Sequence, residues 1–415
     1  MPTIAYLSNE FPSPVESYVV DEIRELRRRW VHVVPSSVRR ADPRNLNEDA
    51  MAFAAETFCL YPLRPGLALQ ALWYCVSHYR LLRDFLRRVL IEGSESPARR
   101  MRAIAHTWLG VYYALLLEGR GIDHIHVHHG YFSSWIAMVA ARMLGVGYSM
   151  TLHGSDLLVH RAYLDLKLKH CRFCLTISEF NRARILQDYP SVDRSKVIVQ
   201  RLGVSPPASL FREEPDAPRF PLLLSVGRLH RVKDHAFLVR ACAELKQRGH
   251  RTLCLIAGEG PERGRLERLI RRLDVTDEVG LLGHVPHDQL DAHYAMADVV
   301  VLTSRSEGIP VVLMEAMAMG KVVLAPEMTG VPELVIPGIT GFLYQPGSLE
   351  EFIAKVQMIC QVHPGLGAMR RAARQHVMQR FHRTKNLEQF ADVFLARIHR
   401  GVETHLHEDP VLQQI

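Results

Sequence analysis

The stretch LLLSVGRLHRVKD, residues 222–234, decides the fold of the second half of the chain. Its short apolar run, Leu222–Val226, is typical of a strand buried in a parallel sheet. Gly227 allows a tight turn after the strand, and a helical pattern follows. Arg228 and Lys233 therefore occupy a loop between a strand and a helix. Two cations beside the positive end of a helix can bind a diphosphate, and the alternative is a solvated surface loop.

The same alternation of apolar runs and amphipathic stretches recurs along the whole chain. In the first half we expect strands at Thr3–Leu7, Val31–Val34, His124–His128, Tyr148–Leu152, Phe173–Ile177 and Val197–Val199. Helical patterns lie between them, at Tyr18–Arg29, Ser134–Leu144 and Ser178–Asp188. In the second half we expect strands at Leu222–Val226, Thr252–Ile256, Val279–Leu282, Val299–Leu302 and Val322–Ala325. Helices are expected there at Asp234–Arg248, Glu262–Leu273, Pro310–Met319 and Leu349–Cys360. This order predicts an α/β fold of doubly wound, mostly parallel sheets.

A segment rich in proline separates the two halves. Residues 205–221 hold five prolines and three acidic residues, which is typical of a linker. We therefore expect two Rossmann-like domains that face a central cleft, in residues 1–205 and 218–383. Helical patterns at about 64–119 predict an insertion in the first domain, and residues 384–415 predict a helix that returns towards it. Ligands of such sheets bind beyond the carboxyl ends of the strands.

Composition sets the class of protein. The 415 residues are 48% hydrophobic and 23% charged, which is ordinary for a globular protein. No run reaches the roughly 18 apolar residues of a membrane-spanning helix. The N-terminus does not resemble a secretory signal. The seven cysteines are an odd number and lie mostly in apolar surroundings, which favours reduced thiols. These features predict a cytoplasmic protein without a disulfide framework.

The net charge of +7 comes largely from arginine clusters in the first hundred or so residues. Such clusters suit phosphorylated ligands, anionic lipid or nucleic acid. No zinc-finger or RNP-type signature accompanies them, so no nucleic-acid partner is expected.

A second candidate loop, SRSEGIPVVLMEAMAMG, covers Ser304–Gly320. Gly308 frees the turn, and a helix follows it. Glu307 lies in the loop and Glu315 lies on the helix, so the two carboxylates can hold different parts of one ligand. Apolar neighbours should bury Glu315 in part, and a buried carboxylate needs a partner. The alternative for Glu315 is a polar residue that the protein itself satisfies.

A third loop, TGVPELVIPGITGF, covers Thr329–Phe342. The backbone N–H groups of Gly330 and Val331 can bind a phosphate there. Glu333 should face the same site. The alternative is an ordinary turn.

In the first half, SMTLHGSD places His153 and Asp156 directly after a strand. A histidine at a strand end can contact a sugar hydroxyl or the reacting centre, although such a residue is often only structural. HVHHG ends a second strand, and EFPSPVES, Glu10–Ser17, ends the first one.

Together these motifs resemble one family, the retaining glycosyltransferases of the GT-B fold, in the large family-4 group of bacterial sugar transferases. In the second half the resemblance runs from Ser225 to Gly347 through GRLHRVKD, AGEGPER, LLGHV, EGIPVVLMEAMAMG, TGVPELV and GITGFLY. In the first half it rests on FPSPVES, HVHHG, TLHGSD and TISEF, and it leaves out roughly Leu46–Gly119. The FPSPVES opening is similar to transferases of exopolysaccharide and colanic-acid-type pathways.

The resemblance implies roles for single residues. Arg228 and Lys233 match the family's diphosphate-binding pair, Glu307 would lie near the donor sugar, Glu315 would bind the ribose, and His153 would lie near the reacting centre. The implied catalytic residues are thus His153, Glu307, Arg228 and Lys233. The donor-binding set adds Gly227, Gly258, Gly308, Ile309, Glu315, Gly330 and Val331.

The first domain would bind the acceptor. The residues expected to contact it are Glu16, Ser17, His129 and Asp156. Two departures from the family pattern stand out: Ser13 and Pro14 replace a frequent Gly-Gly pair, and Asp234 replaces a frequent glycine.

These expectations define a function. The protein would move a sugar from a nucleotide diphosphate-sugar donor to the hydroxyl of a sugar or lipid-linked sugar acceptor, with retention, in bacterial surface polysaccharide synthesis. The chain has no Asp-x-Asp pair, so no metal and no other cofactor are expected. One alternative is a nucleotide-sugar epimerase or a phosphorylase on the same architecture, and another is a non-catalytic sugar-nucleotide-binding protein. A dehydrogenase is disfavoured because SNEFPSPVES lacks Gly-x-Gly-x-x-Gly.

One stretch suggests a membrane surface. Across Leu67–Ile91, apolar residues recur at helical spacing, with Arg80, Arg83, Arg87 and Arg88 among them. A basic amphipathic helix of this kind can lie among anionic headgroups, which would put the protein on the inner face of the membrane. The alternative is a helix whose apolar face packs on the domain core.

Overall fold

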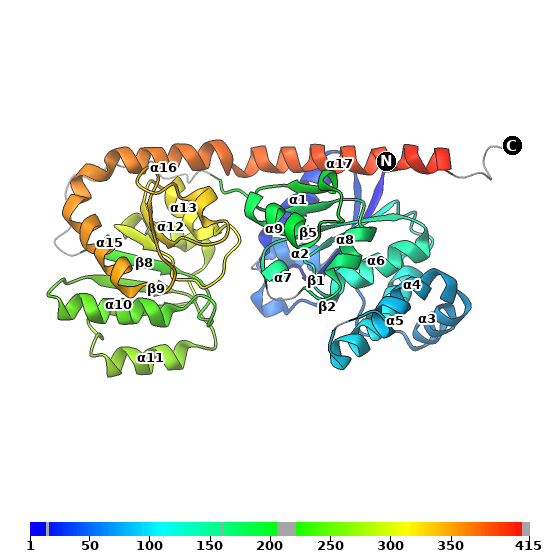
Figure 1. Ribbon diagram of the computed structural model, residues 1–415, viewed down its shortest axis with the longest axis horizontal. Helices are drawn as coiled ribbons and strands as arrows, with labels where there is room; N and C mark the ends of the chain where they lie inside the picture. Colours follow the sequence, from blue (N-terminus) through cyan, green and yellow to red (C-terminus); the bar gives the residue numbers. More distant parts are fainter. Residues whose placement is uncertain (14–15, 94, 159–160, 206–220, 409–415) are drawn as a thin grey trace. The chain divides into compact units, whose positions relative to one another are not determined.

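The computed structural model describes residues 1–13, 16–93, 95–158, 161–205 and 221–408 (Figure 1). The chain divides into two compact units. The first unit is made of Met1–Ile177, Asn181–Gln200 and Leu387–Ile415, and the second of Ser178–Phe180 and Arg201–Asn386. Almost all of the expected linker, residues 206–220, lies outside the described residues.

The first unit is built on a parallel sheet of seven strands in the order β3-β2-β1-β4-β5-β6-β7. These are β1 (Thr3–Phe11), β2 (His32–Arg40), β3 (Phe58–Cys59), β4 (His124–His128), β5 (Gly147–Leu152), β6 (Cys174–Thr176) and β7 (Val197–Val199). The strand order reverses between β1 and β4, and a ligand crevice is expected beyond their carboxyl ends.

Helices cover this sheet. They are α1 (Ser17–Arg28), α2 (Glu48–Glu56), α6 (Phe132–Leu144), α7 (Ser155–Leu158), α8 (Leu164–His170) and α9 (Glu179–Asp188), with short 3-10 turns η1 (Pro43–Asn45) and η2 (Arg194–Lys196). The inserted region forms three helices, α3 (Pro65–Ser77), α4 (Tyr79–Leu90) and α5 (Pro97–Leu117), which lie together at one edge of the unit (Figure 1). Helix α5 approaches α6 closely because it has Gly110 at the contact, where a Cβ atom would lie 2.6 Å from the Cβ of Val139.

The second unit has a parallel sheet of six strands in the order β10-β9-β8-β11-β12-β13. These are β8 (Leu222–Val226), β9 (Leu253–Ala257), β10 (Val279–Gly283), β11 (Val299–Val301), β12 (Val322–Pro326) and β13 (Phe342–Tyr344). Here the order reverses between β8 and β11.

Two helical layers enclose this sheet. On one face pack α10 (His235–Gln247), α11 (Arg263–Arg272) and α15 (Leu349–Val362), and on the other α12 (His287–Met296), α13 (Val311–Ala318) and α16 (Gly367–Arg380). The short helix α14 (Val331–Leu334) and the 3-10 turn η3 (His363–Leu366) complete the unit.

The last helix, α17 (Arg383–Glu408), begins in the second unit and continues in the first. Its residues Phe390, Phe394 and Ile398 are buried in one cluster with Tyr6 and Phe173. The helix therefore completes the core of the first unit. Among the described residues, no helix combines the length and the apolar character that crossing a membrane requires.

Candidate functional site

In the second unit, the loops that follow β8 and β11 lie side by side, because these strands are neighbours where the strand order reverses. The Nζ atom of Lys233, in the first loop, lies 2.6 Å from Oε1 of Glu307 in the second. The Thr303 hydroxyl donates to the carbonyl oxygen of Lys233 at 3.0 Å. The sheet thus brings together the lysine and the glutamate that the sequence placed in separate motifs.

Arg228 stands in the same loop as Lys233, and its side chain is exposed. Among the described residues, its guanidinium group makes no ion pair and no hydrogen bond. Lys233 is partly buried and is neutralised by Glu307. Arg305 is likewise paired with Asp234, and Arg231 with Glu262. Arg228 is therefore the arginine of these two loops that remains available to an anion among the described residues.

Glycines allow these loops to approach each other. A Cβ atom on Gly258, after β9, would lie 2.0 Å from the carbonyl oxygen of Gly227. A Cβ atom on Gly330, after β12, would lie 2.5 Å from the carbonyl oxygen of Gly308. Four loops of the sheet thus converge through backbone contacts that any side chain would block.

Ile309 and Val331, which the family resemblance placed at the donor, are buried in the core of the second unit. The Val331 amide donates to the carbonyl oxygen of Met328 at 2.9 Å. Neither side chain is exposed to a ligand, and the Val331 amide is already engaged.

Glu315 has two partners from α12. The Tyr294 hydroxyl donates to Oε2 at 2.7 Å, and Nε2 of His287 lies 3.0 Å from Oε1. The hydrogen bond to Glu315 raises the pKa of His287, and the charges of Glu315 and Asp291 add to the effect. Glu315 is thus satisfied within the protein, although carboxylate oxygens can each accept a further hydrogen bond from a ribose hydroxyl.

Glu333 has a different role from the one its motif suggested. Its carboxylate accepts from the amides of Glu179 and Phe180 at 3.0 and 2.8 Å, and Nη2 of Arg201 lies 3.2 Å away. A carboxylate can satisfy free backbone amides in this way, so Glu333 holds the segment of Glu179 and Phe180, which belongs with it to the second unit.

In the first unit, the strand ends gather a group of histidines. Nε2 of His153 lies 3.0 Å from Nδ1 of His128, and Nε2 of His128 lies 3.0 Å from Oε2 of Glu22. The Tyr6 hydroxyl also donates to Glu22. His128 is fully buried, and Glu22 is nearly so. A buried carboxylate is therefore linked to His153 through His128.

The carboxylate sets the direction of this hydrogen-bonded chain. A carboxylate only accepts while it is ionised, so in the neutral form of His128 the Nε2 atom carries the proton and the Nδ1 atom is the acceptor. Nε2 of His153 must then donate to His128, and Nδ1 of His153 keeps its lone pair. Burial lowers the pKa of His153 well below its ordinary value, and the charges of the nearby histidines lower it further. His153 is thus a neutral imidazole with one free acceptor nitrogen.

His129 has the opposite character. Burial disfavours its charged form, but the hydrogen bond from its Nε2 to Glu16, at 2.8 Å, and the charges of Glu16 and Asp156 outweigh burial and raise its pKa. The His129 and His153 rings lie 4.6 Å apart. The site therefore pairs a histidine that favours the cation with one held neutral.

The other residues expected at the acceptor occupy different environments. Ser17 is exposed at the first position of α1. Asp156 is fully buried and accepts from the amides of Gly130, His153 and Gly154, at 3.0, 3.1 and 2.8 Å. Asp156 thus holds two loops together and does not reach the surface.

Glu22, His126 and His128 are also close enough to share a metal ion, since one ligand atom of each lies within 4.8 Å of the others. Both nitrogens of His126 already contact hydroxyls, those of Ser149 at 2.8 Å and Thr151 at 3.1 Å. Both nitrogens of His128 are engaged as well. This set of donors fits a hydrogen-bonded network better than an ion.

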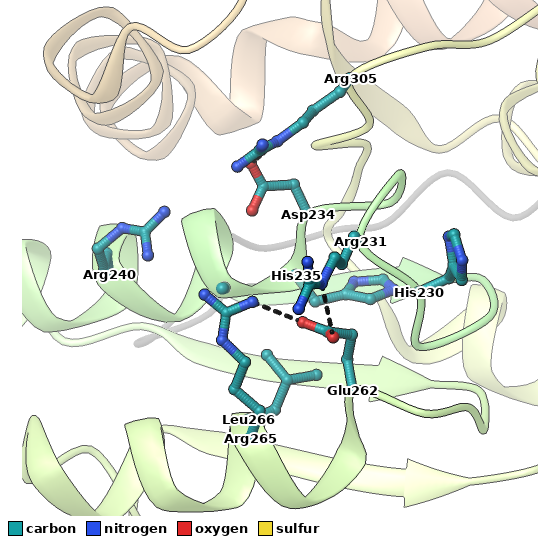
Figure 2. Close-up of a pocket in the computed structure, with 10 residues that line it drawn as sticks. His230, Arg231, Asp234, His235, Arg240, Glu262, Arg265, Leu266 and Arg305 are labelled. Atoms are coloured by element: carbon teal, nitrogen blue, oxygen red, sulfur yellow. Dashed lines mark hydrogen bonds and ion pairs between the residues drawn. The ribbon is translucent and has the colours of Figure 1, made fainter. Parts of the chain in front are cut away.

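The second unit also has a cationic pocket of about 280 Å³ beside the β8–α10 loop (Figure 2). Its lining includes Arg231, Arg240, Arg265 and Arg305 but neither Arg228 nor Lys233. Figure 2 shows Glu262 between Arg231 and Arg265, and Arg305 beside Asp234. Sequence reasoning missed this pocket because its residues come from three separate segments.

Comparison with known proteins supports the resemblance. A family model described as glycosyl transferases group 1 matches residues 209–376. The amylovoran biosynthesis glycosyltransferase AmsK of Erwinia amylovora is 32% identical over 205 residues, which cover 48% of this chain and 50% of that one. The putative colanic acid biosynthesis glycosyltransferase WcaL of Salmonella typhimurium is 33% identical over 206 residues, with the same coverage. The chain thus matches about half the length of these relatives.

Solved structures match nearly the whole chain. Sucrose-phosphate synthase from Thermosynechococcus elongatus has a TM-score of 0.72 at 19% identity and covers 95% of this chain and 99% of its own. Anabaena Alr3699/HepE in complex with UDP-glucose has a TM-score of 0.69 at 17% identity, with 95% and 100% coverage. At such identities the likeness concerns the fold. The chain has the α/β GT-B fold, and its residues 209–376 match the family described as glycosyl transferases group 1.

Proposed function

We propose that this protein transfers a sugar from a nucleotide diphosphate-sugar to an acceptor hydroxyl, with retention of anomeric configuration, in bacterial surface polysaccharide synthesis. The observation that carries the proposal is the grouping of Arg228, Lys233 and Glu307 where the strand order of the second sheet reverses. The names of AmsK and WcaL support the pathway, and the UDP-glucose complex of HepE supports the donor class.

The chemistry follows from the charges. Departure of the diphosphate leaves an oxocarbenium-like sugar, and negative charge grows on the leaving group. Arg228 and Lys233, beside the N-terminus of α10, stabilise that charge in the transition state. Glu307 holds the Lys233 ammonium group in place, and its second oxygen is left for a sugar hydroxyl.

The acceptor side rests on the histidine group of the first unit. The free Nδ1 of His153 can accept a hydrogen bond from a hydroxyl. We place no covalent intermediate in the reaction, so the acceptor attacks on the face that the leaving group vacates.

The test is the Arg228→Ala variant, assayed by nucleotide release over a panel of UDP-, GDP- and dTDP-sugars. A charge-assisted bond that strengthens in the transition state is worth about 3 kcal/mol, so kcat/KM should fall roughly a hundredfold. Lys233→Ala should behave alike. The matched control is Arg231→Ala, an exposed arginine of the same loop, which should keep wild-type turnover. Near-wild-type kcat/KM in both site variants would refute the diphosphate site.

Release of nucleotide should also require an added acceptor. Turnover of the donor that is equally fast without any acceptor would instead favour hydrolysis or epimerisation.

We further propose that no metal takes part. Arg228, Lys233 and the helix dipole would neutralise the diphosphate, and the chain has no Asp-x-Asp pair. Turnover should therefore survive EDTA. Loss of turnover in EDTA with recovery in magnesium or manganese would contradict this.

We also propose that the first unit binds peripherally to the surface of an anionic membrane. The expected single helix across Leu67–Ile91 is instead two helices, α3 and α4, with His78 between them. Helix α4 buries Leu82 and Phe85 in the core, as the alternative required. On α3, in contrast, four large apolar side chains are exposed by more than half: Leu69, Leu72, Trp73 and Val76.

The next helix adds positive charge. Arg80 and Arg83 of α4 are exposed and make no ion pair with the described residues. Arg88, which lies near them in the sequence, is instead paired with Glu95 and Asp165 inside the unit. Exposed apolar side chains on α3 and unpaired arginines on α4 are the two features that suit the headgroup region of anionic lipid.

Flotation with vesicles of phosphatidylcholine and phosphatidylglycerol tests this. Binding should need the anionic lipid, fall with salt, and weaken in Leu72→Ser/Trp73→Ser and in Arg80→Glu/Arg83→Glu. The control is Arg271→Glu, an exposed arginine of the second unit. If the wild-type protein fails to float at low salt, a soluble acceptor becomes the better proposal.

A further inference from the structure

The first unit contains a pocket of about 380 Å³ that none of the expected site residues lines. It opens between α5, the start of α6 and the segment that leads into α8. Its lining residues are Arg99, Arg102, Ala103, His106, Gly130, Tyr131, Phe132, Trp135, Ala162, Tyr163 and Lys167. The lining therefore combines four aromatic rings with three cationic side chains and has no carboxylate.

Two of the cations are unpaired. Arg99 and Arg102 are exposed, and neither makes an ion pair or hydrogen bond with the described residues. Both come from the first turns of α5 and lie on one wall of the pocket. Because none of the described residues that line the pocket is acidic, the charge of these two arginines is left for an anion.

Lys167 closes the pocket from inside. It is 3% exposed, and its Nζ donates to the carbonyl oxygens of Gly130 and Tyr131 at 2.8 Å and of Ala162 at 3.1 Å. The lysine thus fixes the two loops that form the floor. Burial lowers its pKa to about 7, against the opposing charges of Asp156 and Asp165.

A buried hydroxyl also has no partner in the described part of the chain. Tyr163 is 4% exposed, and its hydroxyl oxygen makes no hydrogen bond with any described residue. Its ring centroid lies 5.0 Å from that of Trp135. Leaving a buried hydroxyl unsatisfied has a cost, which a ligand oxygen in the pocket would remove.

The pocket adjoins the histidine group. The ring of Tyr131, part of the lining, stacks on His129 with centroids 5.3 Å apart. His129 in turn lies beside His153. A molecule held in the pocket would therefore extend towards the free nitrogen of His153.

We propose that this pocket binds the acceptor by a phosphate ester next to a sugar ring. Arg99 and Arg102 take the phosphate, the aromatic floor packs on the ring, and the Tyr163 hydroxyl bonds a ring oxygen or hydroxyl. This rests on the proposed transferase function and names the chemistry of its acceptor. The phosphate can belong to a free sugar phosphate or to a lipid-linked one.

Calorimetric titration of the full chain tests the proposal. The probes are glucose 1-phosphate, farnesyl diphosphate, inorganic phosphate and methyl α-glucoside. Sugar phosphate should bind more tightly than inorganic phosphate or the neutral glucoside, because only it fills both parts of the pocket. Tighter binding of farnesyl diphosphate than of glucose 1-phosphate would assign the phosphate to a lipid.

The variant Arg99→Ala/Arg102→Ala should weaken the best phosphate probe by about thirtyfold or more, since two charge-assisted bonds are lost. Tyr163→Phe should weaken it by about three- to tenfold. The matched control is Arg271→Ala/Arg272→Ala, which removes two exposed arginines of α11 in the second unit. Equal binding in wild type and the pocket variants, or no saturable binding of any phosphate probe up to about 10 mM, overturns the proposal.

UDP titrations separate this result from the transferase function. The pocket variants should bind UDP as the wild type does. If phosphate probes bind in the pocket but no sugar nucleotide is turned over, the transferase function fails and the pocket stands. If Arg228→Ala abolishes turnover while the pocket variants keep the wild-type KM for acceptor, the pocket proposal fails alone.

Discussion

The hydrogen-bonding capacity of His153, at the end of a strand, is set by the buried residues that contact it. The Nε2–H group of His153 donates to Nδ1 of His128, so Nδ1 of His153 remains a free acceptor. The carboxylate of Glu22 in turn orients His128. Glu22 is thus a positioning residue: it acts through His128 on His153, which can bind a hydroxyl.

We expect Glu22→Gln to lower turnover by about ten- to a hundredfold, because an amide can present a donor and reverse the tautomer of His128. Binding of UDP should not change. The pH dependence of kcat/KM should also shift, which a purely structural role would not cause. The control is Glu25→Gln, one turn apart on the same helix, where the carboxylate pairs with Arg29. An equal loss of turnover in both variants would exclude a role for the Glu22–His128–His153 hydrogen-bonded chain in the reaction.

The two glutamates of the second unit should differ in effect. Glu307 contacts Lys233, whereas Glu315 is held by Tyr294 and His287. Glu315→Gln should weaken UDP binding by about tenfold, the value of one good hydrogen bond to a charged group. Glu307→Gln should lower kcat with little effect on UDP affinity. Calorimetry beside turnover separates the two, and unchanged UDP affinity in Glu315→Gln would exclude ribose binding.

Whether a site residue could be predicted from the sequence depends on how far apart the residues that form the contact lie along the chain. Arg228 and Lys233 were predictable, because a strand, a glycine and a helix within a dozen residues place a loop. The Glu22–His128 contact joins residues 106 positions apart, and no local pattern carries it. The same holds for both pockets, whose linings come from several elements.

At the scale of elements, most strands of both sheets were predictable because they are continuous apolar runs. Strand β4 and strand β7 have the expected bounds. Strand β1 continues to Phe11, past the polar Ser8–Glu10, because β2 pairs with it along its whole length. Strand β3 has two residues, too few for a pattern to show. Strand β13 was missed because the third candidate loop was extended to Phe342, the first residue of this strand. Helix α12 is largely exposed and its apolar residues do not follow a clear helical period, so it was missed.

Helix α17 should be essential to the first unit. Phe394 is fully buried and packs with Phe173 and Phe390. Phe394→Ala should lower the free energy of unfolding by about 3 to 5 kcal/mol, the usual cost of emptying such a site. Gln389→Ala, at an exposed position of the same helix, should cost little. Denaturant titration measures both, and a loss below about 1 kcal/mol for Phe394→Ala would show that the helix end is dispensable.

For the whole molecule, buried neutral histidines should make the fold sensitive to acid. Burial lowers the pKa of His124 to about 3 in the first unit, and that of His235 to about 4 in the second. Below about pH 6.5 these histidines bind protons in the unfolded chain but stay neutral in the folded one. The free energy of unfolding therefore falls as the pH drops towards these pKa values. Each such group can contribute up to about 1.4 kcal/mol per pH unit.

Urea unfolding at pH 7 and pH 5 should therefore show lower stability at pH 5. His124→Gln should reduce that difference in the first unit, since glutamine does not titrate. His129 acts in the opposite sense: its raised pKa adds stability at low pH that is lost as the pH rises through it. Equal stability at both pH values would mean that these opposing terms cancel.

The chain passes from the first unit to the second and back, and this determines where chimeras of related proteins can be joined. Almost the whole second unit is a single stretch, Arg201–Asn386, while the first unit resumes at Leu387. A gene fusion with one crossover, in the proline-rich segment, would pair a foreign α17 with a native hydrophobic core and mismatch Phe390 and Phe394. Two crossovers, one on each side of the stretch, would exchange the unit to which we assign the donor and leave that core intact. Chimeras built to change donor preference should therefore keep residues 387–408 with the N-terminal half.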